Sequence, residues 1–153
     1  MTAIDAAAKR IRGTAQLPLP QTERAQLIAA AIREATGHRW VGIYAVTAGE
    51  VANLAWSGPA PPAHPSFPAD AGLTAAAIET HAPVVSGDVG GDPRYLQALP
   101  TTASELIIPI VVDGAVVGTL DVESDRADAF GAADRLALER IAAALAGLYG
   151  ASA

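Results

Sequence analysis

The segment SELIIPIVVDGAVVGTLDVES, residues 104–124, constrains the fold more than any other part of the chain. Two apolar runs flank an Asp-Gly pair at 113–114, the pair that best suits a two-residue type I′ turn. The segment therefore predicts a β-hairpin. Its outer ends carry carboxylates, Glu105 on one arm and Asp121 with Glu123 on the other. These acids either face water or line a pocket.

Helices and further strands are predicted on both sides of this hairpin. The expected helices are residues 2–12, 22–36, 72–81 and 131–149, and the expected strands are 39–47, 51–57 and 83–86. Thr22 is the expected N-cap of the second helix, and Gly37 follows its C-terminus. The Pro-rich residues 58–68 are expected to form a loop, and residues 87–103 a long crossing with one helical turn. Strands between terminal helices predict an α+β fold with a central antiparallel sheet.

The chain length of 153 residues suits one domain, which we expect to span residues 1–153. Residues 1–20 are interpreted as an N-terminal helix and a Pro-containing lead-in, and residues 21–150 as the core. The hydrophobic fraction is 51% and the charged fraction 17%. Such a composition favours globular packing over disorder.

The net charge of −6, with ten Lys and Arg that form no basic cluster, argues against nucleic acid and anionic membrane as partners. No apolar stretch reaches the ~20 residues that a bilayer requires. No signal peptide is recognisable, so the cytoplasm is the expected location. The absence of cysteine excludes disulfides, thiolate metal sites and thiol nucleophiles. The three histidines lack the spacing of a shared metal site, so we expect no metal and no cofactor.

Side-chain alternation places chemically related residues on one face of two predicted strands. Trp40 and Tyr44 share a face of the first strand, and Asp121 and Glu123 share a face of the second arm of the hairpin. If these strands are neighbours, aromatic rings and carboxylates lie together. Such a group suits a small cation, for example the α-ammonium of an amino acid. The alternative is that the acids are solvated and the aromatic residues belong to the core.

Glu105 joins this group only if the hairpin is irregular. A perfect two-residue hairpin sets Glu105 opposite Val122, on the core face. Pro109 lacks the N–H that a regular ladder requires. We predict a one-residue bulge near Pro109, or an equivalent break, which would place Glu105 opposite Asp121.

Four motifs, DVGGDPRY, SELIIPI, DGAVVGTLDVES and AFGAAD, resemble a GAF domain in their order and spacing, over about residues 22–149. Within that superfamily, RWVGIY, FPADAGLTAAA, SELIIPI and GTLDVES are similar to the free methionine-(R)-sulfoxide reductases. The resemblance implies a GAF-like sheet with the N- and C-terminal helices on one face and a ligand pocket on the other. It also implies ligand-holding roles for the residues Trp40, Tyr44, Glu105, Asp121 and Glu123.

The same resemblance aligns the reductases' cysteines near His64, at Thr74 and near Ala98, and none of these positions is a cysteine. Reductase chemistry requires a thiolate that attacks the sulfoxide sulfur and a second thiol that resolves the product. We therefore expect no thiol redox activity. His64, whose loop would fold over the sheet, and Thr74 complete the candidate ligand-binding set.

The leading hypothesis is a stand-alone GAF domain that binds or senses a small molecule, with an amino acid or an amine as the expected ligand. An enzyme related to the reductases that uses non-cysteine chemistry is one alternative. A closed-pocket GAF domain that serves dimerisation and protein interaction is the other. The resemblance also implies a homodimer formed through the terminal helices, and any signal would pass to a partner protein.

Overall fold

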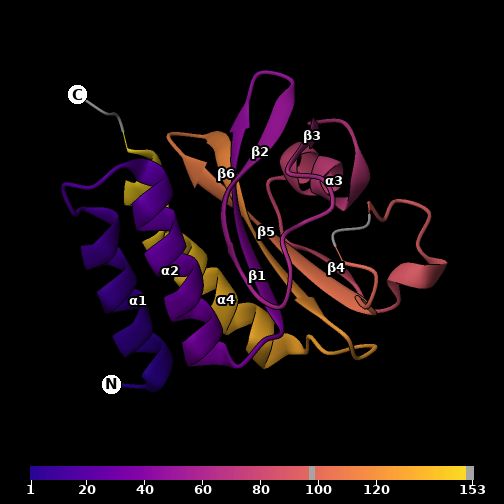
Figure 1. The fold of residues 1–153 in the computed structure, drawn as a ribbon, viewed down its shortest axis with the longest axis horizontal. Helices are drawn as coiled ribbons and strands as arrows, with labels where there is room; N and C mark the ends of the chain where they lie inside the picture. Colours follow the sequence, from indigo (N-terminus) through magenta and orange to yellow (C-terminus); the bar gives the residue numbers. More distant parts are fainter. Residues whose placement is uncertain (97–98, 151–153) are drawn as a thin grey trace.

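The computed structural model describes residues 1–96 and 99–150, and within them the chain forms a sheet covered by helices. The strands are β1 (Trp40–Thr47), β2 (Glu50–Ser57), β3 (Ser66–Pro68), β4 (Val84–Ser86), β5 (Ser104–Val112) and β6 (Ala115–Ser124). Their order in the sheet is β3-β2-β1-β6-β5-β4, and every neighbouring pair is antiparallel (Figure 1). The helices are α1 (Ala3–Ala15), α2 (Gln21–Thr36), α3 (Gly72–Thr80) and α4 (Ala132–Ala144), with short 3-10 turns η1 (Val89–Gly91) and η2 (Ala146–Tyr149).

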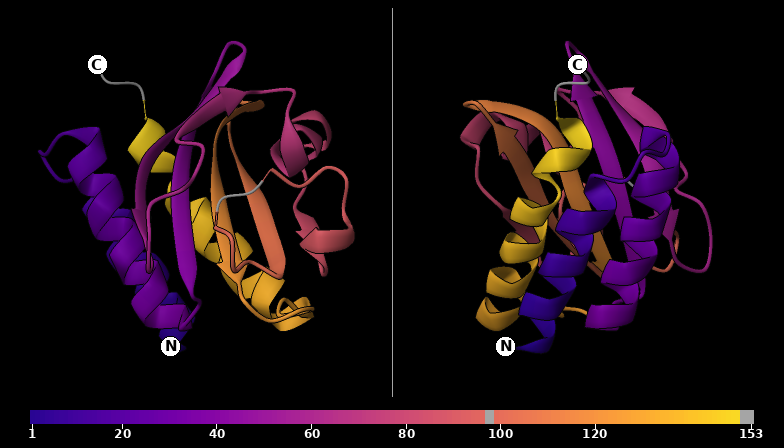
Figure 2. Two further views of the ribbon diagram at one scale, coloured as in Figure 1. Left: turned by 45° about the vertical axis from the view of Figure 1, so that its right-hand side comes forward. Right: turned by 90° about the vertical axis from the view of Figure 1, so that its left-hand side faces the viewer.

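The long helices form a layer on one face of the sheet. Figure 2 shows α4, α1 and α2 side by side, with α1 between the other two, and α3 on the far side of the sheet. Helices α2 and α4 contact the strands directly, whereas α1 packs mainly against α2 and α4. The predicted α+β class, with the terminal helices on one face of an antiparallel sheet, is confirmed.

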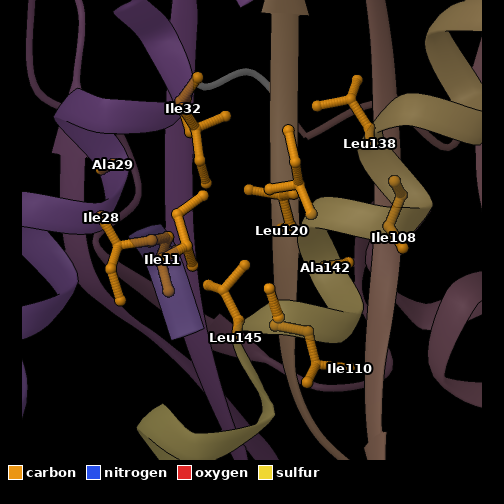
Figure 3. Packing of buried hydrophobic residues seen from close by; sticks show 14 of the residues in the cluster. Ile11, Ile28, Ala29, Ile32, Ile108, Ile110, Leu120, Leu138, Ala142 and Leu145 are labelled. Carbon is orange, nitrogen blue, oxygen red and sulfur yellow. The ribbon is translucent and has the colours of Figure 1, made fainter. Parts of the chain in front are cut away.

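The main core lies between this helix layer and the sheet (Figure 3). Its central side chains are fully buried, and they come from three helices and the middle of the sheet: Ile11, Ile28, Ile32, Leu120, Leu138 and Leu145. Burial of each such side chain contributes about 1.5–3 kcal/mol to folding. The apolar side chains along one side of each helix and on one face of β6 therefore fix the helix layer against the sheet.

Two local predictions were wrong. The N-cap of α2 is Pro20 rather than Thr22, and it makes no side-chain cap hydrogen bond because the proline ring has no acceptor atom. Residues 66–68, predicted as loop, form β3, since the edge of a sheet tolerates proline. The C-terminal end of α2 was predicted correctly, with Gly37 in the left-handed region at φ 73°. Within the described residues, no helix is long and apolar enough to cross a bilayer.

The β5–β6 hairpin has the predicted turn and the predicted break. Asp113 and Gly114 both have positive φ, 51° and 79°, as a type I′ turn requires. The register shifts between Ile110 and Val111, next to Pro109.

Beyond this shift, Glu105 pairs with Glu123 rather than with Asp121, and Asp121 pairs with Ile107. The predicted partner was wrong because the extra residue, Val117, lies in β6, which moves the register in the opposite direction. The three carboxyl groups nevertheless end on the same face of the sheet, because a one-residue shift in either strand reverses the facing of Glu105.

Candidate ligand-binding site

Strands β1 and β6 are neighbours, and their pairing brings the predicted site residues together. Trp40 pairs with Glu123, Gly42 with Asp121, and Tyr44 with Thr119. Paired residues of an antiparallel ladder point to the same face. This face is the one opposite the helix layer, because Val122, which lies between the two acids in β6, belongs to the main core.

A cavity of about 20 Å³ lies on this face. All the predicted site residues except Trp40 line it: Tyr44, His64, Thr74, Glu105, Asp121 and Glu123. Its apolar lining comes from the side chains Phe67, Leu73, Leu96 and Ile107. The volume is close to that of a single water site, so the structure shows a nearly closed site.

Trp40 packs beside the cavity and does not line it. The side chain is fully buried, in a cluster with Tyr44, and its indole N–H donates a hydrogen bond to the Ala60 carbonyl at 3.0 Å. The second ring of the cavity is that of Phe67, whose centroid lies 5.9 Å from that of Tyr44 in an edge-on arrangement. Phe67 was not predicted, although it stands in the quoted motif FPADAGLTAAA.

The three carboxyl groups are almost completely buried, with exposed fractions of 5% for Glu105, 4% for Asp121 and 1% for Glu123. Asp121 accepts a hydrogen bond from the Thr119 hydroxyl at 2.8 Å. Glu123 accepts hydrogen bonds from the hydroxyls of Thr102 at 2.6 Å and Tyr95 at 3.3 Å. Thr102 and Tyr95 lie in the β4–β5 connection. Neither was predicted as a site residue, although Tyr95 ends the quoted motif DVGGDPRY.

Burial dominates the electrostatics of the site. Burial raises the pKa of Asp121 to about 8. The hydrogen bond from Thr119 lowers this pKa, and the charge of Glu123 raises it further. Burial raises the pKa of Glu123 to about 7 against the hydrogen bonds from Thr102 and Tyr95. The pKa of Glu105 is raised well above its ordinary value by burial, then by the charges of Glu123 and Asp121.

The charges of the site are unbalanced, because no Lys or Arg is found among the described residues that line the cavity. The phenol of Tyr44 is neutral, since burial and then the neighbouring acids raise its pKa well above 10. His64 lies at the exposed rim of the cavity. The arrangement is therefore suited to a ligand that brings its own positive charge.

The positions aligned with the reductases' cysteines are only partly brought together. Thr74 is buried near the N-terminus of α3 and lines the cavity with His64, and Ala98 lies outside the described residues. Among the described residues, no group of three or more His, Asp or Glu is arranged to hold a metal ion.

The fold and the site define a known class of domain. The family model of the GAF domain matches residues 21–148, most of the chain, and the protein belongs to this family. GAF domains are in general modules that bind or sense small molecules.

Known relatives fall within the same class. The chain is 28% identical over 115 residues to GAF domain-containing protein A of Dictyostelium discoideum, covering 74% of this chain and 72% of that protein. The free methionine-R-sulfoxide reductase of Neisseria meningitidis, whose structure contains its substrate, superposes with a TM-score of 0.84 at 26% identity, over 95% of this chain and 87% of the reductase. The type II free methionine-R-sulfoxide reductase of Thermoplasma acidophilum superposes with a TM-score of 0.78 at 28% identity, over 84% of this chain and 92% of the reductase.

Proposed function

We propose that this GAF domain binds a small molecule with a cationic group, an amino acid or an amine, in the cavity on the face of β1, β5 and β6. The observation that carries the proposal is the burial of Glu105, Asp121 and Glu123 around one cavity that no Lys or Arg lines within the described chain. Buried carboxyl groups are costly unless they are paired or neutralised. An ammonium group would pair with them, and the face of Tyr44 would add cation–π attraction of ~0.5–2 kcal/mol.

Ligand entry requires the covering side chains to move, because a cavity of about 20 Å³ is smaller than any amino acid. His64 comes from the β2–β3 connection and Leu96 from the β4–β5 connection, so both belong to segments outside regular strands. Movement of these two side chains need not disturb the sheet.

The reductase activity of the structural relatives does not extend to this chain in our proposal, because their thiol chemistry requires cysteines and the sequence has none. We expect free methionine sulfoxide to be bound rather than reduced. A coupled reductase assay should show background rates only, and turnover abolished by boiling would contradict this expectation.

A thermal-shift screen tests the binding proposal. Amino acids, methionine sulfoxide and alkylamines should raise the unfolding temperature, whereas 2-oxo acids and cyclic nucleotides, which are anionic, should not. A ligand at 100 times its dissociation constant adds about 2.7 kcal/mol of stability. Absence of a shift with every amine would count against the proposal.

Substitutions identify the site that produces any shift. Asp121→Asn and Glu123→Gln each remove a carboxylate from the cavity. Each variant should need at least ten times more ligand than the wild type to give the same rise in unfolding temperature. Asp125→Asn is the matched control, because Asp125 lies just beyond β6 with its side chain 50% exposed. Unchanged binding in both cavity variants would exclude this cavity as the site.

We also propose a homodimer that forms through the outer face of α4 and α1 and passes the state of the site to a partner protein. Leu136 of α4 is 65% exposed, beside a groove that Ile4, Ala133 and Ala143 also line. Light scattering coupled to size exclusion should give twice the chain mass for the wild type and the chain mass for Leu136→Glu. Leu27→Glu, on the exposed side of α2, is the control and should remain dimeric.

A further inference from the structure

The three carboxyl groups of the cavity differ in their partners. Asp121 and Glu123 each accept hydroxyl hydrogen bonds. Glu105 is only 5% exposed, and among the described residues it is influenced by burial and by neighbouring acids, with no hydrogen bond that would stabilise its charged form. An ionised carboxylate in this position would be desolvated without compensation, which is among the most costly arrangements in a protein interior.

Among the described residues, the charged neighbours that act on Glu105 are all acidic. Glu123 stands directly opposite it in the β5–β6 ladder, where Cβ atoms are typically about 4.5–5.5 Å apart. Asp121 is two residues further along β6, and Tyr44 of β1 lines the same cavity. The aspartate Asp92 acts on Glu105 from the β4–β5 connection.

The bases near the site do not neutralise Glu105. Arg94 is held by Asp92, to which it donates two side-chain hydrogen bonds of 3.0 and 2.9 Å, and its side chain is 51% exposed. His64 lines the cavity from an exposed position in the β2–β3 connection. Neither forms an ion pair with Glu105 in the structure.

Building on the proposed function, we propose that Glu105 is the residue that selects for charge: it is protonated in the free protein and exchanges its proton for the cation of the ligand. In this exchange the O–H bond of the Glu105 carboxyl breaks, the proton leaves to solvent, and the carboxylate pairs with the ammonium group. No electron is transferred and no covalent bond forms with the ligand. The site then responds to the ligand and to pH together.

The raised pKa of Glu105 supports this exchange, because burial and then the charges of Glu123 and Asp121 hold its proton. An arriving cation reverses the balance, since an opposite charge favours the ionised form. Binding that releases one proton tightens about tenfold for each unit by which the pH rises, until Glu105 ionises in the free protein. A neutral ligand would show no such dependence.

The first measurement needs no ligand. Carboxyl carbon NMR of the whole chain should show Glu105 titrating well above the ordinary range for glutamate, about 4.3 in model peptides. Glu105→Gln copies the size and the neutrality of the protonated acid, so it identifies the signal and should fold. Glu50→Gln, at an exposed position of β2, is the control and should leave the Glu105 titration unchanged.

The second measurement uses methylammonium chloride, the smallest alkylammonium salt, because the cavity is close to the size of one water. Calorimetric titrations at about pH 6, 7 and 8, each in two buffers of different ionisation enthalpy, give affinity and proton release together. The wild type should release at least one proton on binding methylammonium and bind at least tenfold more tightly per pH unit, after subtraction of the effect of tetramethylammonium at equal ionic strength. Glu105→Gln should release about one proton fewer and show a correspondingly weaker pH dependence, the remainder coming from Asp121 and Glu123.

The outcomes separate the exchange from the binding function. Titration of Glu105 in the ordinary range overturns the exchange. Binding of methylammonium without proton release also overturns it, but leaves the proposed function standing. If neither methylammonium nor any amine of the thermal-shift screen binds, the exchange and the proposed function fail together.

Discussion

Gly42 shapes the aromatic side of the site by having no side chain. A Cβ atom at this position would collide with the ring of Trp40 and would lie 3.0 Å from the ring of Tyr44. The Trp40 ring therefore lies across the strand and closes over the backbone of Gly42. This close approach leaves Tyr44, rather than Trp40, to face the cavity.

Substitution of Gly42 by alanine should destabilise the protein by about 1–3 kcal/mol, because the Trp40 ring must move out of a fully packed cluster. Urea unfolding measures the change. Gly13→Ala, in α1 with nothing within 4 Å of the added Cβ, is the control and should stabilise by up to ~1 kcal/mol through helix propensity. Equal effects of the two substitutions would show that the Trp40 contact is unimportant.

Thr102 sets the ionisation of Glu123. Its hydroxyl donates to the Glu123 carboxyl at 2.6 Å, and this hydrogen bond lowers the pKa of Glu123 against the effect of burial. Thr102→Val should raise the pKa of Glu123 above about 7 and cost about 1 kcal/mol of stability. An NMR titration checks the shift, with exposed Thr101→Val as control. An unchanged titration would show that the hydrogen bond does not persist in solution.

The β5–β6 hairpin combines a tight turn with one extra residue. The turn requires positive φ at Asp113 and Gly114, and the extra residue Val117 adjusts the register so that Glu105 faces the cavity. The hairpin thus contributes both to the sheet and to the site. Its turn can be tested without touching the site.

Alanine at Gly114 should destabilise the hairpin by about 1 kcal/mol, since its φ of 79° strains an L residue that has a Cβ. Asparagine adopts this conformation more readily, so Gly114→Asn should lose less. Thermal unfolding followed by circular dichroism compares the two variants. Equal losses, or a larger loss for asparagine, would contradict a turn of this type.

In the whole molecule, the buried carboxyl groups couple stability to pH. The folded-state pKa values of Asp121 and Glu123, about 8 and about 7, lie above those of the unfolded chain, about 4. The folded protein therefore binds more protons than the unfolded chain between these values. Its free energy of unfolding falls as the pH rises through this range.

Between about pH 5 and pH 9 the ligand-free protein should lose several kcal/mol of stability, as measured by urea unfolding across the range. In Asp121→Asn the side chain at 121 is neutral at every pH, so this loss should be smaller, with Glu105 and Glu123 accounting for the remainder. Asp125→Asn, at an exposed position, should leave it as in the wild type. A stability that rises with pH over this interval would contradict the buried, protonated state of the site.

Patterns between residues close in the chain were sufficient to predict most of the elements. The Asp-Gly turn, the alternation of β1 and β6 and the helical stripe of α2 each depend on residues within a few positions of one another, so their structure follows from local backbone preferences. The same alternation placed Tyr44, Asp121 and Glu123 on one face. The sequence therefore determined the fold class and half of the site.

The tertiary structure decided the remaining features of the site, because these features depend on contacts between segments far apart in the chain. Pro109 of β5 signalled a break in the hairpin, but local patterns did not show that the extra residue is Val117 of β6, which decides that Glu105 pairs with Glu123. The closure of the site by Phe67 and Leu96, and the displacement of Trp40 to its side, arise from packing among connections far apart in the chain. Such packing is set by the whole set of neighbouring volumes rather than by any stretch of the sequence.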